Sequence, residues 1–185
     1  MTENHQLKSG TLSLVKADVT DYEIDAFVFY ARDDLKLGSG FGNAIAMRGG
    51  PSIRKELEEL GSIKVTEAVA TGAGDMKAKY IIHADGPKFQ EADTEAKLKK
   101  TIINTLKCAE DKGAESLALP PMGAGFYGVP IEKSAEITVQ TIAGYMNNGA
   151  KLKSVVICAL DNREFKPLQE QFNVLQLSSG SNGKK

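Results

Sequence analysis

The sequence predicts one α/β domain built on a largely parallel sheet with helices on both faces. Two observations lead to this prediction. Short β-prone segments alternate along the chain with longer segments whose apolar residues follow helical spacing. Several β-prone segments are apolar at successive positions, as strands covered on both faces are. A third observation concerns function, because glycine-rich stretches follow strand ends, where ligands bind in such sheets.

The first two strands are expected at residues 11–16 and 26–29. The second of them, AFVF, is apolar at every position, which is typical of a strand buried on both faces. Residues 17–25 between these strands are rich in aspartate. Because aspartate favours turns and helix starts, this segment is expected to be a turn or a short helical connection.

A glycine-punctuated loop is expected at residues 35–42. A helix is predicted to follow at residues 43–48, and the sequence Gly-Gly-Pro at 49–51 interrupts it. Proline suits the first turn of a helix and glycine suits its end. A second helix is therefore expected at residues 52–60, with Gly61 ending it.

The middle of the chain predicts two strands and a long helix. The strands are expected at residues 67–71 and 79–84, with a glycine-containing connection at 72–74. Residues 94–112 form an amphipathic segment with apolar side chains at helical spacing. Gly113 is expected to end this helix.

The last third of the chain continues the alternation. A short buried strand is expected at residues 116–119, directly before two prolines, and a helix at residues 131–146. Residues 154–160 are the most β-prone segment of the sequence. A final short helix is predicted at residues 164–172, completing a single domain without internal repeats.

The chain of 185 residues has the length of one domain. Residues 1–9 are polar and are expected to be a flexible leader without a signal sequence. The domain itself is expected to span residues 10–173. Residues 174–185 end in a tail of serine, glycine, asparagine and lysine, which is expected to be disordered.

The charge balance excludes some classes of partner. The chain carries 23 basic and 24 acidic residues, giving a net charge of −1. Proteins that bind duplex nucleic acid usually have a clear basic excess, so no duplex nucleic acid partner is expected. No apolar run approaches the ~18 residues that would span a bilayer. The sequence therefore predicts a cytoplasmic protein without a membrane partner, and it does not indicate an oligomeric state.

Cysteine and histidine offer no metal site. Cys108 and Cys158 each lie in an apolar, periodic context and are expected to be reduced core thiols. His83 lies within a strand-like segment and is expected to be a packed core histidine, whereas His5 lies in the polar leader. Because no cysteine, histidine or carboxylate spacing typical of metal ligands is present, no metal is expected.

Two glycine-rich stretches are the strongest indication of a binding site. They occupy residues 38–42 and 123–128, and each precedes a predicted helix. Glycine lets the backbone approach a diphosphate closely and turn its N–H groups toward it. The positive N-terminal end of the following helix adds to this attraction. Neither stretch has the lysine of a Walker loop, and neither combines Gly-x-Gly-x-x-Gly spacing with the later acidic residue of a dinucleotide-binding fingerprint.

The order of these segments is similar to that of macro domains. The matching segments are residues 17–20, 25–28, 37–45, 70–72, 79–83, 86–87 and 120–130. Each segment alone is a weak signal, but together they make the resemblance specific over residues 10–173. The resemblance implies a three-layer α/β/α fold with a mixed but largely parallel sheet, and it implies binding of ADP-ribose or a related adenine nucleotide.

The resemblance also assigns roles at the adenine end of the site. Asp18 would accept a hydrogen bond from the adenine amino group, and the backbone N–H of Val19 would bond a ring nitrogen. A carboxylate there would discriminate against the keto oxygen of guanine. Leu160 falls near where several relatives place an aromatic side chain against the adenine, so it would give contact without stacking. Without the resemblance, Asp18 would be taken for a turn or capping residue.

The two glycine-rich stretches would hold the diphosphate and the second ribose. The residues assigned to this role are Gly38, Ser39, Gly40, Phe41, Gly42, Gly123, Ala124 and Gly125. Phe126 or Tyr127 would line the distal end of the cleft, with core packing as the alternative for each aromatic side chain.

Two departures from the family pattern concern the distal ribose. Residues 29–32 are Phe-Tyr-Ala-Arg where many macro domains have Asn-Ala-Ala-Asn. Arg32 has no acceptor and cannot replace the last asparagine of that motif. Gly42 lies where some hydrolytic members have an aspartate that helps to activate water. Arg32 could instead contact a phosphate, pair with Asp33 or Asp34, or remain solvated. Whether Phe29 and Tyr30 line the distal pocket or close it stays open at this point.

Three functions are compatible with the sequence. The first is a module that binds ADP-ribose, a related ADP-containing metabolite or ADP-ribosyl groups on proteins, with an altered distal-ribose site. The second is an enzyme of the same fold, a phosphatase or hydrolase acting on ADP-ribose 1″-phosphate or ADP-ribosyl esters. The third is a degenerate module retained for protein contacts. No catalytic residue is assigned and no cofactor is expected.

Overall fold

The structure is a computed structural model that describes residues 2–38 and 40–181. Within these residues, seven strands form one sheet in the order β1-β2-β7-β6-β3-β5-β4. The strands are β1 (Thr2–Gln6), β2 (Thr11–Lys16), β3 (Ala26–Tyr30), β4 (Ala68–Gly72), β5 (Tyr80–Ala84), β6 (Ser116–Leu119) and β7 (Ser154–Ala159). The helices are α1 (Phe41–Gly49), α2 (Pro51–Leu60), α3 (Thr94–Asp111), α4 (Ile131–Asn147) and α5 (Asn162–Ser181), with 3₁₀ turns η1 (Val19–Asp21) and η2 (Gly125–Tyr127).

The sheet is mixed, with antiparallel strands only at its two edges. β2, β7, β6, β3 and β5 pair in parallel. β1 runs antiparallel to β2 at one edge, and β4 runs antiparallel to β5 at the other. The prediction of a mixed but largely parallel sheet is therefore confirmed.

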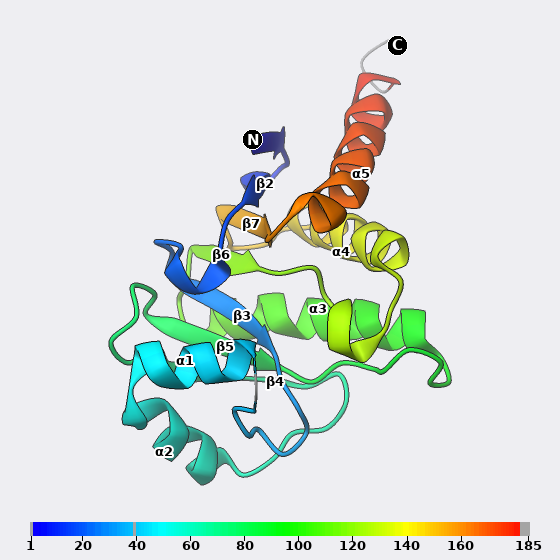
Figure 1. Cartoon of the computed structure of the whole chain (residues 1–185). Helices are drawn as coiled ribbons and strands as arrows, with labels where there is room; N and C mark the ends of the chain where they lie inside the picture. Colours follow the sequence, from blue (N-terminus) through cyan, green and yellow to red (C-terminus); the bar gives the residue numbers. More distant parts are fainter. Residues whose placement is uncertain (1, 39, 182–185) are drawn as a thin grey trace.

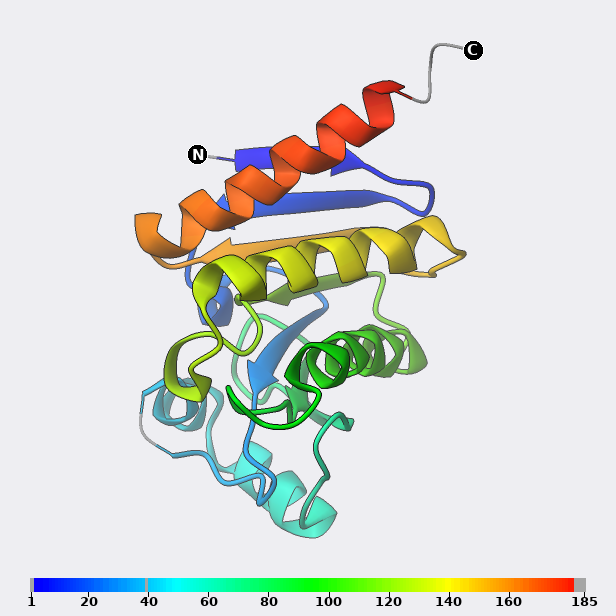
Figure 2. The same cartoon turned by 90° about the vertical axis from the view of Figure 1, so that its right-hand side faces the viewer.

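Helices cover both faces of the sheet, as Figure 1 shows. One core cluster joins the apolar sides of α3, α4 and α5 to one face, with side chains such as Leu98, Val139 and Phe172 fully buried. The other cluster joins α1 and α2 to the opposite face through residues such as Ile45 and Ile53. Figure 2 shows α4 and α5 side by side across the sheet. These three layers are the predicted α/β/α arrangement.

The elements inside the domain lie within two residues of their predicted bounds, and the exceptions are at its two ends. The expectation of a flexible leader is wrong for residues 2–6, which form β1. Thr2 pairs with Val15 and Gln6 pairs with Thr11, and both His5 and Leu7 are buried. The strand escapes prediction because an edge strand needs only one buried face, so its other positions can be polar.

The expected disordered tail is also wrong for residues 174–181, because α5 continues to Ser181. The apolar positions Phe165, Leu168 and Phe172 are buried, and Leu175 packs against the same cluster. This spacing keeps one side of the helix on the sheet beyond the predicted end at residue 172. Residues 182–185 of the predicted tail lie outside the described residues.

Three further observations bear on the earlier expectations. Cys158 is buried and Cys108 half-buried, and both are free thiols. Across the described part of the chain, no helix is both long and apolar enough to cross a membrane. In that same part, no three histidine, cysteine or carboxylate side chains gather in a way that would hold a metal ion.

Candidate functional site

A groove runs across the carboxyl ends of the parallel strands. It consists of two adjoining cavities of about 490 Å³ and about 260 Å³. Both cavities are lined by Gly40, Phe41, Pro120, Leu160 and Glu164. Pro120 directly follows β6 and Leu160 directly follows β7. The groove therefore lies where ligands bind in open α/β sheets.

Asp18 lines the smaller cavity together with Val19, just after β2. Its Oδ1 accepts hydrogen bonds from the backbone N–H of Thr20 at 2.9 Å and from the Thr20 hydroxyl at 2.7 Å. Its Oδ2 accepts from Nη1 of Arg48 at 3.2 Å. Asp18 thus caps η1, as the sequence alone would suggest. Its side chain keeps 45% of its surface exposed, so the carboxylate also remains accessible to a ligand.

The charge of Asp18 is fixed by these contacts. Partial burial raises its pKa, but the hydrogen bonds from Thr20 and the charge of Arg48 outweigh burial and lower the pKa overall. The side chain is therefore ionised at neutral pH and can only accept hydrogen bonds. An exocyclic amine satisfies such an acceptor, whereas a keto oxygen does not.

The larger cavity is lined by backbone from both glycine-rich stretches. Gly38, Gly40 and Gly42 line one side. Gly123, Ala124 and Gly125 line the other. Three residues of the second stretch need glycine, because Gly123 has φ 78°, Gly125 has φ 71° and Gly128 has φ 78°. Ser39 and the side chain of Phe126 lie outside the described residues.

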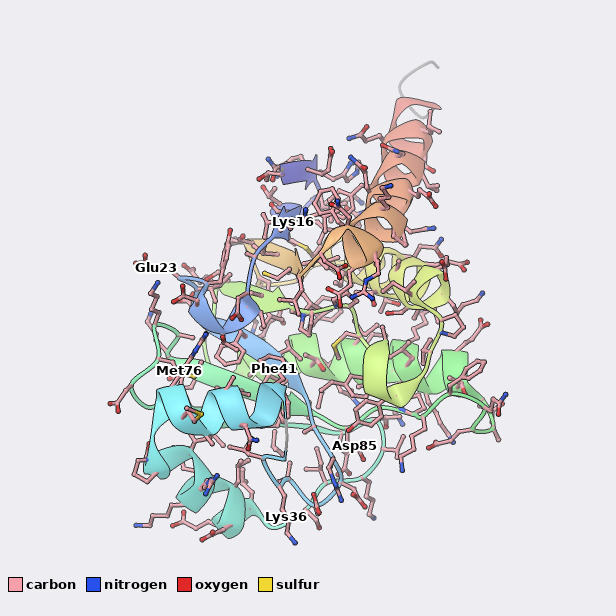
Figure 3. All side chains as sticks on the ribbon, in the orientation of Figure 1. Lys16, Glu23, Lys36, Phe41, Met76 and Asp85 are labelled. Carbon is pink, nitrogen blue, oxygen red and sulfur yellow. The ribbon has the colours of Figure 1, made fainter. Side chains whose placement is uncertain are left out.

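Aromatic side chains form the wall of the larger cavity. The Phe29 ring meets Phe41 edge to face with centroids 5.1 Å apart, and Figure 3 shows Phe41 at the end of α1 nearest β3. Tyr30 and Tyr127 pack at 4.4 Å. Phe29, Tyr30 and Tyr127 all line the cavity.

The hydroxyls of Tyr30 and Tyr127 each donate a hydrogen bond to a backbone carbonyl. The Tyr30 hydroxyl donates to the carbonyl of Pro87 at 2.9 Å. The Tyr127 hydroxyl donates to the carbonyl of Ala31 at 2.8 Å. A Cβ at Gly86 would lie 2.0 Å from the Tyr30 hydroxyl, so only glycine fits beside it. The tyrosine pair is therefore a fixed part of the cavity wall.

Arg32 pairs with Asp34, which is one of the arrangements expected from the sequence. Its Nη2 lies 3.3 Å from Oδ2 of Asp34, and 61% of its side chain is exposed. An exposed pair of this kind is weak, at about 0.2–1 kcal/mol, so Arg32 can exchange Asp34 for an anionic ligand. Arg32 and Lys36 both line the larger cavity, and they bring positive charge to it.

Two buried titratable residues lie close together in the sequence, because His83 is in β5 and Asp85 directly follows this strand. His83 is fully buried, and its Nε2 lies 2.9 Å from the Thr71 hydroxyl. Burial lowers the pKa of His83 to about 4, so it is neutral and structural. Asp85, labelled in Figure 3, is 5% exposed, and its Oδ2 has no hydrogen-bond partner among the described residues. Burial, then the charges of Asp33 and Glu91, raise the pKa of Asp85 to about 6 against the opposing charge of Lys88.

Asp85→Asn is expected to stabilise the protein at neutral pH by on the order of 1–3 kcal/mol, because it removes a buried carboxylate that lacks a full set of partners. Between about pH 4 and 6, native Asp85 keeps a proton that the unfolded chain has lost, so its contribution to stability falls as pH rises. The gain should therefore vanish near pH 4. Urea unfolding at both pH values measures it, and an equal gain at both would contradict the assignment.

Sequence reasoning missed several residues that line the groove. The larger cavity also contains Lys36, Pro120 and Pro121, and Glu164 lines both cavities. The position of the two prolines and of Glu164, shortly after the ends of β6 and β7, was a usable signal. The twelve proposed binding residues other than Ser39 and Phe126 all line one cavity or both.

Comparison with known proteins identifies the family. The Macro domain family model matches residues 31–138. A macro domain-containing protein of Caldanaerobacter subterraneus subsp. tengcongensis is 34% identical over 170 residues, covering 89% of this chain and 97% of that protein. A macro domain-containing protein of Listeria monocytogenes is 32% identical, covering 88% of this chain and 97% of that protein.

Solved structures show the same fold. A macrodomain of Oceanobacillus iheyensis with ADP superimposes with a TM-score of 0.91 at 24% identity, covering 96% of this chain and 98% of that chain. A point mutant of that macrodomain with ADPR gives a TM-score of 0.87 at 26% identity, covering 95% of this chain and 98% of that chain. Together with the order of the elements and the position of the groove, these similarities show that the chain belongs to the macro domain family.

Proposed function

We propose that this protein binds ADP-ribose or a closely related ADP-containing ligand, including ADP-ribosyl groups on proteins. The observation that carries the proposal is one continuous groove with Asp18 at one end and backbone from two glycine-rich stretches along the rest. The Oceanobacillus iheyensis macrodomain structures with ADP and with ADPR support the same ligand class.

The adenine is proposed to occupy the smaller cavity. Asp18 would accept from the adenine amino group, and the backbone N–H of Val19 would donate to a ring nitrogen. Apolar surface from Ala44, Cys158 and Leu160 lines the same cavity and gives the purine ring its contact area. Leu160 is 69% exposed, so it can cover a ligand that enters beside it.

The diphosphate is proposed to lie in the larger cavity. Its oxygens would accept from the backbone N–H groups of residues 38–42 and 123–125, which approach the ligand closely because most of them lack side chains. Gly40 caps the N-terminus of α1, and Phe41 and Gly42 begin this helix, whose dipole favours a negative charge. Arg32 and Lys36 add positive charge at this end of the groove.

The distal-ribose end is where this chain is proposed to differ from other macro domains. The hydroxyls of Tyr30 and Tyr127 are both engaged by backbone carbonyls. Arg32 offers donors but no acceptor. A distal ribose would therefore gain few directed hydrogen bonds here, and most of the affinity would come from the ADP part of the ligand.

Isothermal titration calorimetry with ADP-ribose, ADP and AMP tests this proposal. We expect ADP and ADP-ribose to bind with dissociation constants within about threefold of one another. AMP should bind at least about tenfold more weakly, which is a loss of about 1.4 kcal/mol. The absence of binding by all three nucleotides would overturn the proposed function. A large preference for ADP-ribose over ADP would overturn the altered distal site.

A further inference from the structure

Glu164 lies at the junction between the two cavities. It lines both of them and is the one charged side chain among the five described residues that they share. Its Oε2 accepts a hydrogen bond from the backbone N–H of Leu160 at 2.7 Å. This contact closes the first turn of α5 back onto the end of β7 and holds the carboxylate at the groove.

The charges along the groove follow a pattern. Asp18 is negative in the smaller cavity and Glu164 is negative at the junction, whereas Arg32 and Lys36 are positive in the larger cavity. A ligand with its negative charge confined to a diphosphate matches this pattern. A ligand with a further phosphate on the adenosine side would bring like charges together.

Two other charged residues near the start of α5 do not alter this pattern. The Arg163 guanidinium is 2.9 Å and 2.7 Å from Oδ2 of Asp161 through Nε and Nη2. This pair is exposed, as the Arg32–Asp34 pair is, but Arg163 lines neither cavity. Arg48 is likewise paired with Asp18 in this structure.

We infer that Glu164 selects ADP-containing ligands whose adenosine ribose carries free hydroxyls, and that it rejects those phosphorylated on that ribose. This inference rests on the proposed function. The adenosine ribose joins the adenine to the diphosphate, so it must lie where the two cavities meet. There the fixed carboxylate accepts from ribose hydroxyls and repels the nearly doubly charged phosphate of a 2′-phosphorylated ligand.

Calorimetric titration with ADP-ribose and with ADP-ribose 2′-phosphate tests the inference. The wild-type protein should bind the 2′-phosphorylated ligand at least about tenfold more weakly, a difference of about 1.4 kcal/mol. Glu164→Gln keeps an acceptor for the Leu160 N–H and removes the charge. In this variant the preference for ADP-ribose over the 2′-phosphorylated ligand should be about tenfold smaller than in the wild-type protein. Glu164→Lys should reverse the preference.

Glu170→Gln is the matched control, because it removes the same charge from an exposed position on the same helix. It should keep the wild-type ratio. ADP-ribose binding with no discrimination by the wild-type protein would overturn the inference, as would an unchanged ratio in both Glu164 variants. If neither ligand bound to the wild-type protein, the proposed function would fail and the inference with it.

Discussion

Asp18→Ala is expected to weaken ADP-ribose binding by about 1.5–3 kcal/mol, because it removes a charged acceptor for the adenine amino group. This corresponds to a dissociation constant about 10- to 150-fold higher. The carboxylate is well placed for this role, since Thr20 and Arg48 orient both of its oxygens and keep it ionised. Calorimetric titration of the variant with ADP-ribose gives the change directly.

Asp21→Ala provides the control for this substitution. Asp21 belongs to the same 3₁₀ turn, is 69% exposed and pairs with Lys77, and it lines neither cavity. The Asp21→Ala variant should therefore bind ADP-ribose as the wild-type protein does. Unchanged affinity in Asp18→Ala would mean that the adenine lies elsewhere. An equal loss in both variants would point to the turn rather than to the carboxylate.

Phe172→Ala is expected to destabilise the protein by about 3–5 kcal/mol, because it leaves a cavity in a closely packed core. Phe172 is fully buried between α5 and the sheet. Val174→Ala, on the exposed side of the same helix, should change stability by less than about 0.5 kcal/mol. Urea unfolding of both variants measures the difference. A loss below about 1 kcal/mol for Phe172→Ala would show that this part of α5 is not docked.

The interior of the fold could be predicted from the sequence because each element carries a strong local pattern. Residues 94–111 repeat apolar side chains at helical spacing, and α3 buries those same side chains. Residues 154–159 are almost uniformly apolar and form the interior strand β7, buried on both faces. In these segments the local pattern and the tertiary packing favour the same element.

The two ends of the chain could not be predicted in the same way. β1 is polar at most positions and exists because β2 offers it a free edge. The end of α5 has weak helical signals of its own, including serine and glycine, but Phe172 and Leu175 dock against the core. In both cases tertiary contacts override weak local propensity.

The site also has features that could be predicted from the sequence and features that could not. The glycine-rich stretches follow strand ends, so their meeting in one groove could be predicted from the rule for parallel sheets. The contact between Arg48 and Asp18 joins residues 30 positions apart in different elements, and no local pattern reveals it. The position of Glu164 after β7 was a usable signal, but its contact with the backbone N–H of Leu160 depends on the first turn of α5 and could not be predicted.

A crystal structure of the protein with ADP-ribose tests the central claim most directly. We predict the adenine amino group within hydrogen-bonding distance of the Asp18 carboxylate, and the diphosphate between residues 38–42 and 123–125. A separate cavity of about 500 Å³ lies between residues 34–37 and α2. ADP-ribose bound in that cavity, or bound in the groove with its adenine away from Asp18, would contradict the account.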